Sequence, residues 1–336
     1  MKQINSCVSA AVDVSAAELV VAMCSGDDPP LVRTFSNHKS GHRQLLRVLK
    51  ARGRQVRVAL ESTGVYGLGL ALALQADPSV EVMVINPRAV KDFIRARMQR
   101  AKTDRVDALG ILDYLQRMPF APWTPPAADV LALQAITRRL TQLKAERTRE
   151  VNRLHAVEQV PTLSKVIVRD LRINIAHLQK RIAALETQAL SVAKASAQLA
   201  PALALVTSVP GIAAKSGLRL LGELLVLPKG LKAPQWVAHA GLDPRPFESG
   251  TSVNKPRRLS KTGNAHLRSA LFLPALVAVR HHQTVKACYQ ALLARGKKPK
   301  VAVIAIMRKL LHALWGVLHH QQPFNPTLFY QQKTTC

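Results

Sequence analysis

Short apolar runs alternate with turn residues over the first part of the chain. Residues 6–15 (SCVSAAVDVS), 17–25 (AELVVAMCS) and 30–37 (PLVRTFSN) each combine small, β-branched and apolar side chains over a short length. Such runs are typical of β-strands, and the short breaks between them favour antiparallel pairing. The pattern therefore predicts a meander of three strands.

Helices then alternate with two further strands. Leu45, Leu46 and Leu49 share one face of a helix predicted at 40–52, and the apolar run at 54–62 predicts a buried strand. A helix is predicted at 65–75, a strand at 80–86, and basic helices at 88–98 and 103–117. The order β-β-β-α-β-α-β-α is that of ribonuclease-H-like domains. In that order the first and fourth strands are adjacent at the sheet centre, and the last helix packs across their ends.

Four prolines in residues 118–129 (MPFAPWTPPAAD) predict a linker at 119–127. Beyond it, apolar residues alternate spacings of three and four, which is typical of a coiled-coil seam. We expect this seam between protomers; pairing within the chain, as two antiparallel helices of one bundle, is the alternative. The seam positions are Leu133, Ile136, Leu140 and Leu143 and, after a break at Pro161, Val168, Leu171, Ile175, Leu178, Ile182, Leu185, Ala189 and Val192.

The C-terminal part is predicted to be mostly helical. A turn at Pro210-Gly211 joins two helices, residues 238–272 are rich in loops and basic side chains, and two further helices precede a tail at 326–336. Trp236 and Trp315 are expected in a core or an interface. The expected fold class is α/β plus α, with an α/β domain at 1–118, coiled-coil helices at 128–200 and a helical domain at 201–325.

Charge narrows the class of partner. The 336 residues include 48 Lys and Arg against 20 Asp and Glu, a formal net charge of +28 spread along the chain. This balance indicates a polyanionic partner, most often nucleic acid, and a merely basic or ribosome-associated protein is the alternative. The four cysteines are far apart, which argues against a zinc site or disulfide framework and favours the cytosol. Asp13 and Glu18 interrupt the first apolar run, so no signal peptide is expected, nor any apolar stretch of the ~18 residues that span a membrane.

Four acids stand out in this basic chain: Asp13, Glu61, Asp104 and Asp107. Asp13 ends the first predicted strand, Glu61 ends the fourth, and Asp104 and Asp107 share a face of the last helix because they are three residues apart. The predicted strand order lets all four converge. Converging carboxylates repel one another unless a cation holds them, and Mg2+ prefers such oxygen ligands and suits phosphate substrates. Each acid alone also fits a turn cap, a helix cap or a solvated surface.

Basic residues surround the last pair of acids and are expected to contact the phosphate backbone of a nucleic acid. They are Arg88, Lys91, Arg95, Arg97, Arg100, Lys102 and Arg105.

Motifs along nearly the whole chain resemble one family. The segments that carry the likeness are VDVS around Asp13, ESTG at Glu61, NPRAVKDF and AKTDRVDA from Asn86, SVPGI at Ser208, GLDPRPFESG at Gly241 and GNAHLRSAL at Gly263. In this order they resemble the DEDD transposases of bacterial insertion sequences (the one-ten and eleven-eleven groups) and the related Piv-type DNA invertases.

The resemblance implies a RuvC-like N-terminal domain, a coiled-coil connection and a C-terminal transposase domain. It implies that the four acids hold Mg2+ and that Ser249 is a nucleophile that forms a covalent phosphoserine with DNA. It further implies donor and target DNA as substrates, a guide RNA (bridge RNA) encoded by the element, a dimer or tetramer, and a place in the bacterial cytoplasm at the nucleoid. Two positions depart from the pattern: Ala16 stands where Lys is common, and PGIA at Pro210 replaces PGIG, which weakens a role for this turn in phosphate binding.

Ser249 by itself is typical of a turn serine. Thr251 and Ser252 are equal candidates without the resemblance, and a serine hydroxyl needs activation. Gly250 lets the backbone bend, so a phosphate can approach. The basic residues that follow, and that could stabilise a pentavalent phosphate, are Lys255, Arg257, Arg258, Lys261, His266 and Arg268.

Three functions remain open from the sequence. The first is an RNA-guided recombinase that moves an insertion sequence, and the second is an invertase that flips a fixed DNA segment without a guide. The third is a non-catalytic nucleic-acid-binding protein whose acids merely cap helices.

Overall fold

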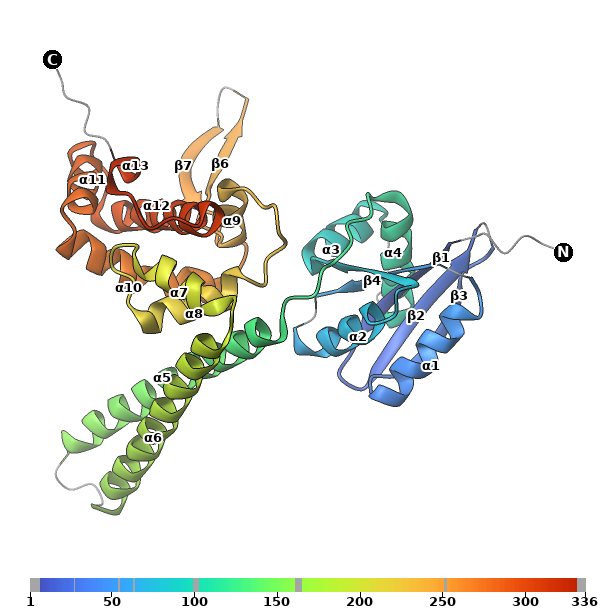
Figure 1. Ribbon diagram of the computed structural model, residues 1–336, viewed down its shortest axis with the longest axis horizontal. Helices are drawn as coiled ribbons and strands as arrows, with labels where there is room; N and C mark the ends of the chain where they lie inside the picture. Colours follow the sequence, from blue (N-terminus) through green and yellow to red (C-terminus); the bar gives the residue numbers. More distant parts are fainter. Residues whose placement is uncertain are drawn as a thin grey trace. The chain divides into compact units, whose positions relative to one another are not determined.

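The computed structural model describes residues 7–26, 28–53, 55–62, 64–98, 103–160, 165–250 and 253–330, without the side chains of Val65 and of 254–257. The chain divides into two compact units, Met1–Pro125 and Pro126–Cys336. Figure 1 shows the first as a sheet with helices and the second as mostly helical, apart from one two-stranded hairpin.

The first unit is built on a mixed sheet of five strands in the order β3-β2-β1-β4-β5. The strands are β1 (Val8–Val14), β2 (Glu18–Ser25), β3 (Leu31–Ser36), β4 (Val56–Glu61) and β5 (Val80–Ile85). β1, β2 and β3 pair antiparallel, whereas β4 pairs parallel with both β1 and β5. The predicted meander and the adjacency of the first and fourth strands are confirmed.

Helices cover both faces of this sheet (Figure 1). α1 (Lys39–Lys50) and α2 (Val65–Gln75) share one core with alternate strand residues such as Val12 and Leu60. α3 (Pro87–Ala96) and α4 (Asp104–Arg117) share a second core with the residues between them, such as Ala11 and Ala59. Successive side chains of a strand point to opposite faces, so every other residue of β1 and β4 faces α4.

The expected linker is partly ordered against the first unit. The Trp123 backbone N–H donates to the Val82 carbonyl at 2.7 Å, and the Trp123 side chain packs against the core beneath α1 and α2. This contact satisfies polar groups on the edge strand β5, which would otherwise be open to pairing with another chain. Residues up to Pro125 therefore belong to the first unit.

The second unit begins with two long helices, α5 (Ala128–Glu158) and α6 (Lys165–Ala195), which we call the arm. Figure 1 shows them side by side, and Leu140 and Leu143 of α5 share a core with Leu178 and Ile182 of α6. The apolar seam is thus closed within the chain. The sequence analysis expected the seam to pair two protomers, whereas in the structure the alternative holds and two helices of the same chain pair.

The rest of the second unit packs around helix α12 (Pro299–His320), which contacts α7, α9, α10 and α11. The other elements are α7 (Leu199–Thr207), α8 (Ala214–Leu224), α9 (Ala233–His239), β6 (Pro244–Ser249), β7 (Val253–Leu259), α10 (Ala265–His281), α11 (Gln283–Ala294) and α13 (Pro326–Phe329). Trp236 is buried in this core and Trp315 packs against it, as expected.

Two sequence expectations fail in this unit. α12 is long and apolar enough to cross a membrane by length and composition, contrary to the expectation that no such stretch exists. Its residues Ile306, Leu310 and Leu314 are fully buried in the protein core, which accounts for its apolar character. The expected tail also starts too early, because α13 lies within it and Phe329 is buried.

Candidate active site

Asp13 and Glu61 lie on the face of the sheet that α4 covers. Asp13 follows Ala11 by two positions on β1, and Glu61 follows Ala59 by two positions on β4. Both alanines belong to the core shared with α4, so the alternation of strand side chains puts the two acids on that same face. Val12 pairs with Leu60 in the parallel ladder, which places the acids at the same end of adjacent strands.

Asp104 and Asp107 form part of the first turn of α4. The helix begins there because the Thr103 hydroxyl accepts a hydrogen bond from the Val106 N–H at 3.2 Å, and acids in a first turn favour the helix dipole. Ala108 and Ile111, each four residues after one of these acids, are buried against the sheet. Residues four apart share a helix face, and Asp107 is half-buried on the sheet side of the helix, whereas Asp104 at its start is exposed.

Electrostatics link three of the four acids. Burial raises the pKa of Glu61 above its ordinary value, and the nearby charges of Asp13 and then Asp107 raise it further. Asp104 is exposed and is absent from the causes of this shift. Within the part of the chain that the structure describes, no three His, Cys, Asp or Glu side chains are arranged as a group able to hold a metal ion.

The basic residues predicted around this site differ in their availability. Arg88 forms an ion pair with Asp92 at 3.5 Å, and Arg97 donates from Nη1 to Asp113 at 2.5 Å, so Arg97 is already engaged. Exposed cations at Lys91, Arg95 and Arg105 complete the described set. The predicted contacts Arg100 and Lys102 lie outside the described residues.

Ser249 ends strand β6, at the tip of the β6–β7 hairpin. It pairs with Val253, and Gly250 turns the chain at φ +55°. All six residues of β6 are exposed, so the hydroxyl is open to solvent on a strand that buries nothing. The alternative nucleophiles Thr251 and Ser252 lie outside the described residues.

Among the cations that follow Ser249, Arg268 has a structural partner, because its Nη1 donates to the Ala240 carbonyl at 2.9 Å. Arg258, Lys261 and His266 are exposed. The side chains of Lys255 and Arg257 lie outside those that the structure describes.

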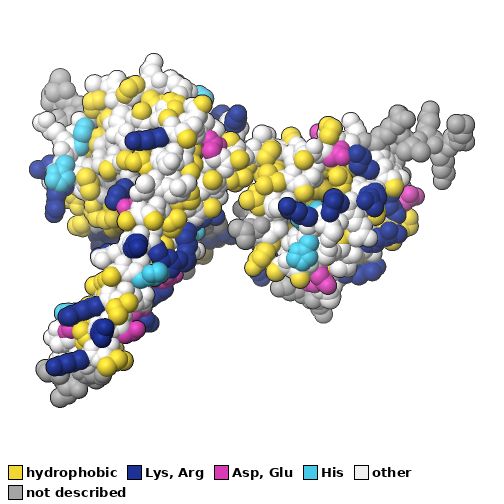
Figure 2. Space-filling view, turned by 60° about the horizontal axis from the view of Figure 1, so that its bottom comes forward, with side chains coloured by type: hydrophobic (Ala, Val, Ile, Leu, Met, Phe, Trp, Pro, Cys, Tyr) yellow, Lys and Arg dark blue, Asp and Glu magenta, His cyan; other side chains and the backbone are white. Residues whose placement is uncertain are grey.

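No acidic residue follows Glu248 in the sequence, so the remainder of the chain carries basic and neutral side chains alone. Figure 2 shows Lys and Arg spread over the visible face of the arm rather than gathered at one end.

The turn at Pro210-Gly211 has a packing role. Gly211 adopts φ +81°, and a Cβ at this position would lie 2.2 Å from the Pro274 carbonyl oxygen of α10. Glycine is therefore required there by close helix packing.

Sequence reasoning missed a buried acid, Glu223 on α8. Its side chain is 1% exposed, and both of its carboxylate oxygens accept hydrogen bonds from Arg138 of α5, at 2.7 and 2.8 Å. Asn264 donates to the same carboxylate at 2.7 Å. Burial raises the pKa of Glu223, but the hydrogen bonds from Arg138 and Asn264 outweigh burial and leave the pKa below its ordinary value. The signal available in the sequence was the one acid of this helix, which lies among Leu220, Leu221 and Leu224.

Comparisons with known proteins agree with these motifs. A model for DEDD transposases of the IS110 type, described as "Transposase", matches residues 10–159, and one described as "Transposase IS116/IS110/IS902 family" matches residues 203–290. A pilin gene-inverting protein of Moraxella bovis is 27% identical over 87% of this chain and 90% of its own length. A putative transposase of Sinorhizobium fredii is 28% identical over 79% of each chain. The first model covers most of the first unit and all of α5, and the second lies within the second unit, so the chain belongs to the IS110 family of DEDD transposases, related to the pilin gene-inverting proteins, and is a DNA recombinase.

Proposed function

We propose that this protein is a Mg2+-dependent insertion-sequence transposase that exchanges DNA strands through Ser249. The observation that carries the proposal is the placement of Asp13 and Glu61 at the same end of two adjacent central strands, on the face that α4 covers. The raised pKa of Glu61, caused by burial and by the charges of Asp13 and Asp107, agrees with it. Families of DEDD transposases use divalent metal ions, and an all-oxygen donor set fits Mg2+. We assign residues 1–118 as the RuvC-like domain and residues 201–325 as the transposase domain.

Asp13, Glu61, Asp104 and Asp107 would hold the metal. Bound there, Mg2+ supplies charge neutralisation at a phosphodiester oxygen. Glu61 must be ionised to bind Mg2+, so a proton on its carboxylate would compete with the metal ion. A bound cation would offset the repulsion that links Glu61 to Asp13 and Asp107.

Ser249 would form the covalent intermediate. Its Oγ forms an ester bond to phosphorus and loses its proton, while the bond from phosphorus to one deoxyribose oxygen breaks and leaves a free hydroxyl. One phosphate ester replaces another, so the energy of the linkage is retained and a second DNA hydroxyl can reverse the step. The exposed position of Ser249 at a hairpin tip supports this role, because an exposed hydroxyl is accessible to a DNA phosphate. Arg258 and Lys261 are proposed to hold the phosphate.

The test uses protein expressed with its native flanking DNA. End-labelled flanking DNA is incubated with protein and Mg2+, quenched in detergent and resolved for a covalent protein–DNA species. Ser249→Ala should abolish that species, whereas Thr251→Ala and Ser252→Ala should keep it. Cutting by Ser249→Ala without a covalent species would identify a hydrolytic nuclease instead. Unchanged strand exchange in Asp104→Ala would remove the catalytic interpretation of the four acids.

A guide RNA encoded by the element is proposed as a further partner. The supporting observation is charge: no carboxylate follows Glu248 to repel a polyanion. Sequencing of the nucleic acid that co-purifies after a high-salt wash tests this, since salt removes non-specific backbone contacts. One discrete RNA from beside the gene would support a guided recombinase.

The second candidate function is inversion of a fixed DNA segment. It is favoured by the likeness to the Moraxella bovis pilin gene-inverting protein along 87% of this chain. A smear of host RNA, or none, in the sequencing experiment would favour this function. Inversion of a reporter segment between inverted copies of the flanking DNA, without added RNA, would establish it.

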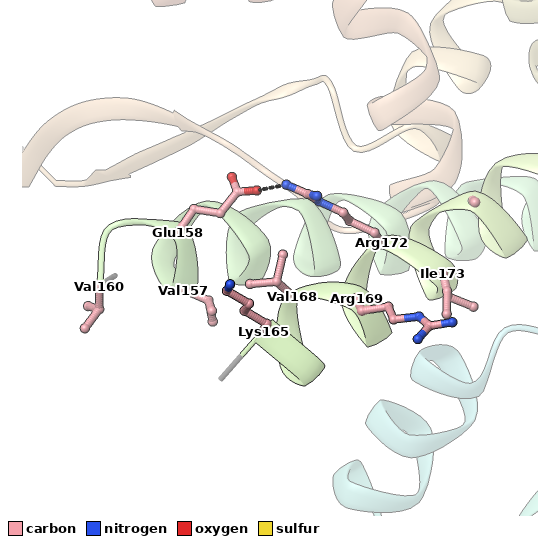
Figure 3. Close-up of a pocket in the computed structure, with 9 residues that line it drawn as sticks. Val157, Glu158, Val160, Lys165, Val168, Arg169, Arg172 and Ile173 are labelled. Carbon is pink, nitrogen blue, oxygen red and sulfur yellow. Dashed lines mark hydrogen bonds and ion pairs between the residues drawn. The ribbon is translucent and has the colours of Figure 1, made fainter. Parts of the chain in front are cut away.

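Oligomerisation is proposed through the end of the arm. Val166, Ile167 and Ile173 of α6 are 72%, 49% and 59% exposed, and exposed apolar patches often mark sites of contact between proteins. Figure 3 shows a hollow nearby, bounded by Val157, Val168 and Ile173 and bridged by the ion pair of Glu158 with Arg172. We propose that a second copy of the chain covers these apolar residues, which gives a dimer or tetramer.

A further inference from the structure

Glu223 connects three segments of the second unit that are far apart in the sequence. The Glu223 carboxylate accepts hydrogen bonds from Arg138 of α5 in the arm and from Asn264, the residue that caps α10. It is the one fully buried charged side chain in the described ranges of the chain. A charge is removed from water at high cost unless it is paired and hydrogen-bonded, so this position is fixed by its partners.

The contact to the arm is tight. Gly222, next to Glu223, lies so close to α5 that an added Cβ would meet the Gln134 Cα at 3.1 Å and the Thr137 Oγ1 at 3.1 Å. Arg138 follows Thr137 directly, and its bidentate pairing fixes the angle of the guanidinium as well as its distance. α8 is therefore held to the arm in one orientation.

The contact to α10 continues into the base of the hairpin that carries Ser249. Asn264 also caps α10, because its Oδ1 accepts from the N–H groups of His266 and Leu267 at 2.9 and 3.1 Å. Its own N–H donates to the His239 carbonyl at 2.7 Å, at the end of α9. One residue thus joins the buried carboxylate, the start of α10 and the end of α9.

The two strands of the hairpin leave from this same place. The Lys261 N–H donates to the Gly241 carbonyl at 3.2 Å, and the Ser260 hydroxyl donates to the Asp243 carboxylate at 2.6 Å. Arg268, one turn after Asn264, donates to the Ala240 carbonyl. All six residues of β6 are exposed, and these contacts hold the base of the hairpin together with Leu259 of β7, which packs against the core.

We propose that Glu223 is a positioning residue for the recombination reaction: together with Arg138 and Asn264 it sets the direction of the Ser249 hairpin relative to the arm. The proposal rests on the role of Ser249 given above. Glu223 touches no reacting atom. It acts through Asn264 and the base of the hairpin, and a small rotation at that base moves the hydroxyl at the tip out of line with a phosphate.

The arm offers a matched control. Glu186 of α6 also ties α5 to α8, through Lys144 at 2.7 Å and Lys215 at 2.6 Å. Its ion-pair partners lie on those two helices, and neither is a residue of α10 or of the hairpin. Glu223→Gln and Glu186→Gln each remove one acid between the same helices at constant side-chain volume. In Glu223→Gln the new amide N–H donors would face the donors of Arg138, so the bidentate pair is lost.

The experiment measures single-turnover formation of the covalent protein–DNA species at saturating flanking DNA. Glu223→Gln should slow it about tenfold or more, since a misplacement of about 1 Å can cost about 100-fold. Its Kd for DNA should stay within about twofold of that of the unsubstituted protein, and Glu186→Gln should keep both values. Asn264→Asp retains the cap but loses the donor to Glu223, and it should reproduce the slow rate. A full rate in Glu223→Gln or Asn264→Asp, or an equal loss in Glu186→Gln, would overturn the proposal.

A second measurement separates this proposal from the serine mechanism. Hydrogen exchange of peptides covering 241–262 should rise in Glu223→Gln and remain unchanged in Glu186→Gln, whether or not Ser249 is the nucleophile. If Ser249→Ala still forms the covalent species while exchange behaves as stated, the mechanism is wrong and the positioning contact stands as a structural fact without that role. Unchanged exchange in Glu223→Gln refutes the positioning contact itself.

Discussion

Replacing Arg138 by Met should destabilise the second unit far more than the same change at its neighbour Arg139. Arg138 is paired with a carboxylate that is 1% exposed. The Arg139 Nη1 lies 3.7 Å from Oε1 of the half-buried Glu146, which is a longer and weaker ion pair. Removing one partner of a buried ion pair costs about 3–5 kcal/mol, because the other charge is left uncompensated. Arg138 is 39% exposed and Asn264 still donates to Glu223, so we expect about 2–3 kcal/mol.

For Arg139→Met the expected loss is at most about 1 kcal/mol, as for other surface ion pairs. Urea unfolding followed by tryptophan fluorescence measures both changes. A Trp123→Phe background leaves Trp236 and Trp315 as the fluorophores, and both lie in the second unit. Equal losses for the two variants would refute the reasoning that burial of Glu223 decides the cost.

The pH dependence gives a second check. The pKa of Glu223 is lowered in the folded protein, so its ionised form contributes stability above the ordinary value of 4.5, and this is lost as pH falls below that value. In Arg138→Met the buried carboxylate lacks its main partner and takes up a proton more readily. The difference in unfolding free energy between the two proteins should therefore shrink as pH falls from 7 toward 4. A constant difference would contradict this account.

Three further predictions concern other positions. Glu61→Gln should raise the melting temperature at pH 7 without divalent metal and remove any stabilisation by Mg2+ in the same scan, because burial and the nearby acids disfavour its charge. Gly211→Ala should destabilise by about 2 kcal/mol or more in urea, since its φ is +81° and Cβ would meet Pro274, whereas Gly316→Ala, inside α12 with open space, should stabilise by about 0.5–1 kcal/mol. Ile173→Asp should lower the mass seen by light scattering without unfolding the arm; an unchanged mass would exclude this patch as the contact.

Local periodicity explains why the first unit could be predicted from the sequence. Its strands are short apolar runs and its helices carry one buried face, so each element can be predicted from a short stretch of sequence. The β6–β7 hairpin could not be found this way, because β6 is exposed on both faces and shows no alternation. The partner of the arm seam was also beyond reach, since two halves of one chain and two chains give the same heptads.

Some residues of the candidate site could be predicted from local sequence, and others could not. The ends of β1 and β4 and the first turn of α4 follow from strand order, so the approach of Glu61 to Asp13 and Asp107 could be anticipated. Glu223 could not, because its partners lie 85 and 41 residues away in the sequence. Contacts of this kind depend on tertiary packing alone.

The length of the arm gives its base a mechanical importance. From Arg138 to the last residue of α5, Glu158, the helix extends about 30 Å at about 1.5 Å per residue. A tilt of about 10° at the base therefore sweeps the far end through about 5 Å, close to one helical turn. In a lever of this length, a small angular error at the base becomes a displacement of the tip large enough to misplace the apolar residues proposed to meet a second copy there. Stiffness is thus needed most where the arm is anchored, which is where the described part of the chain places its one buried charge.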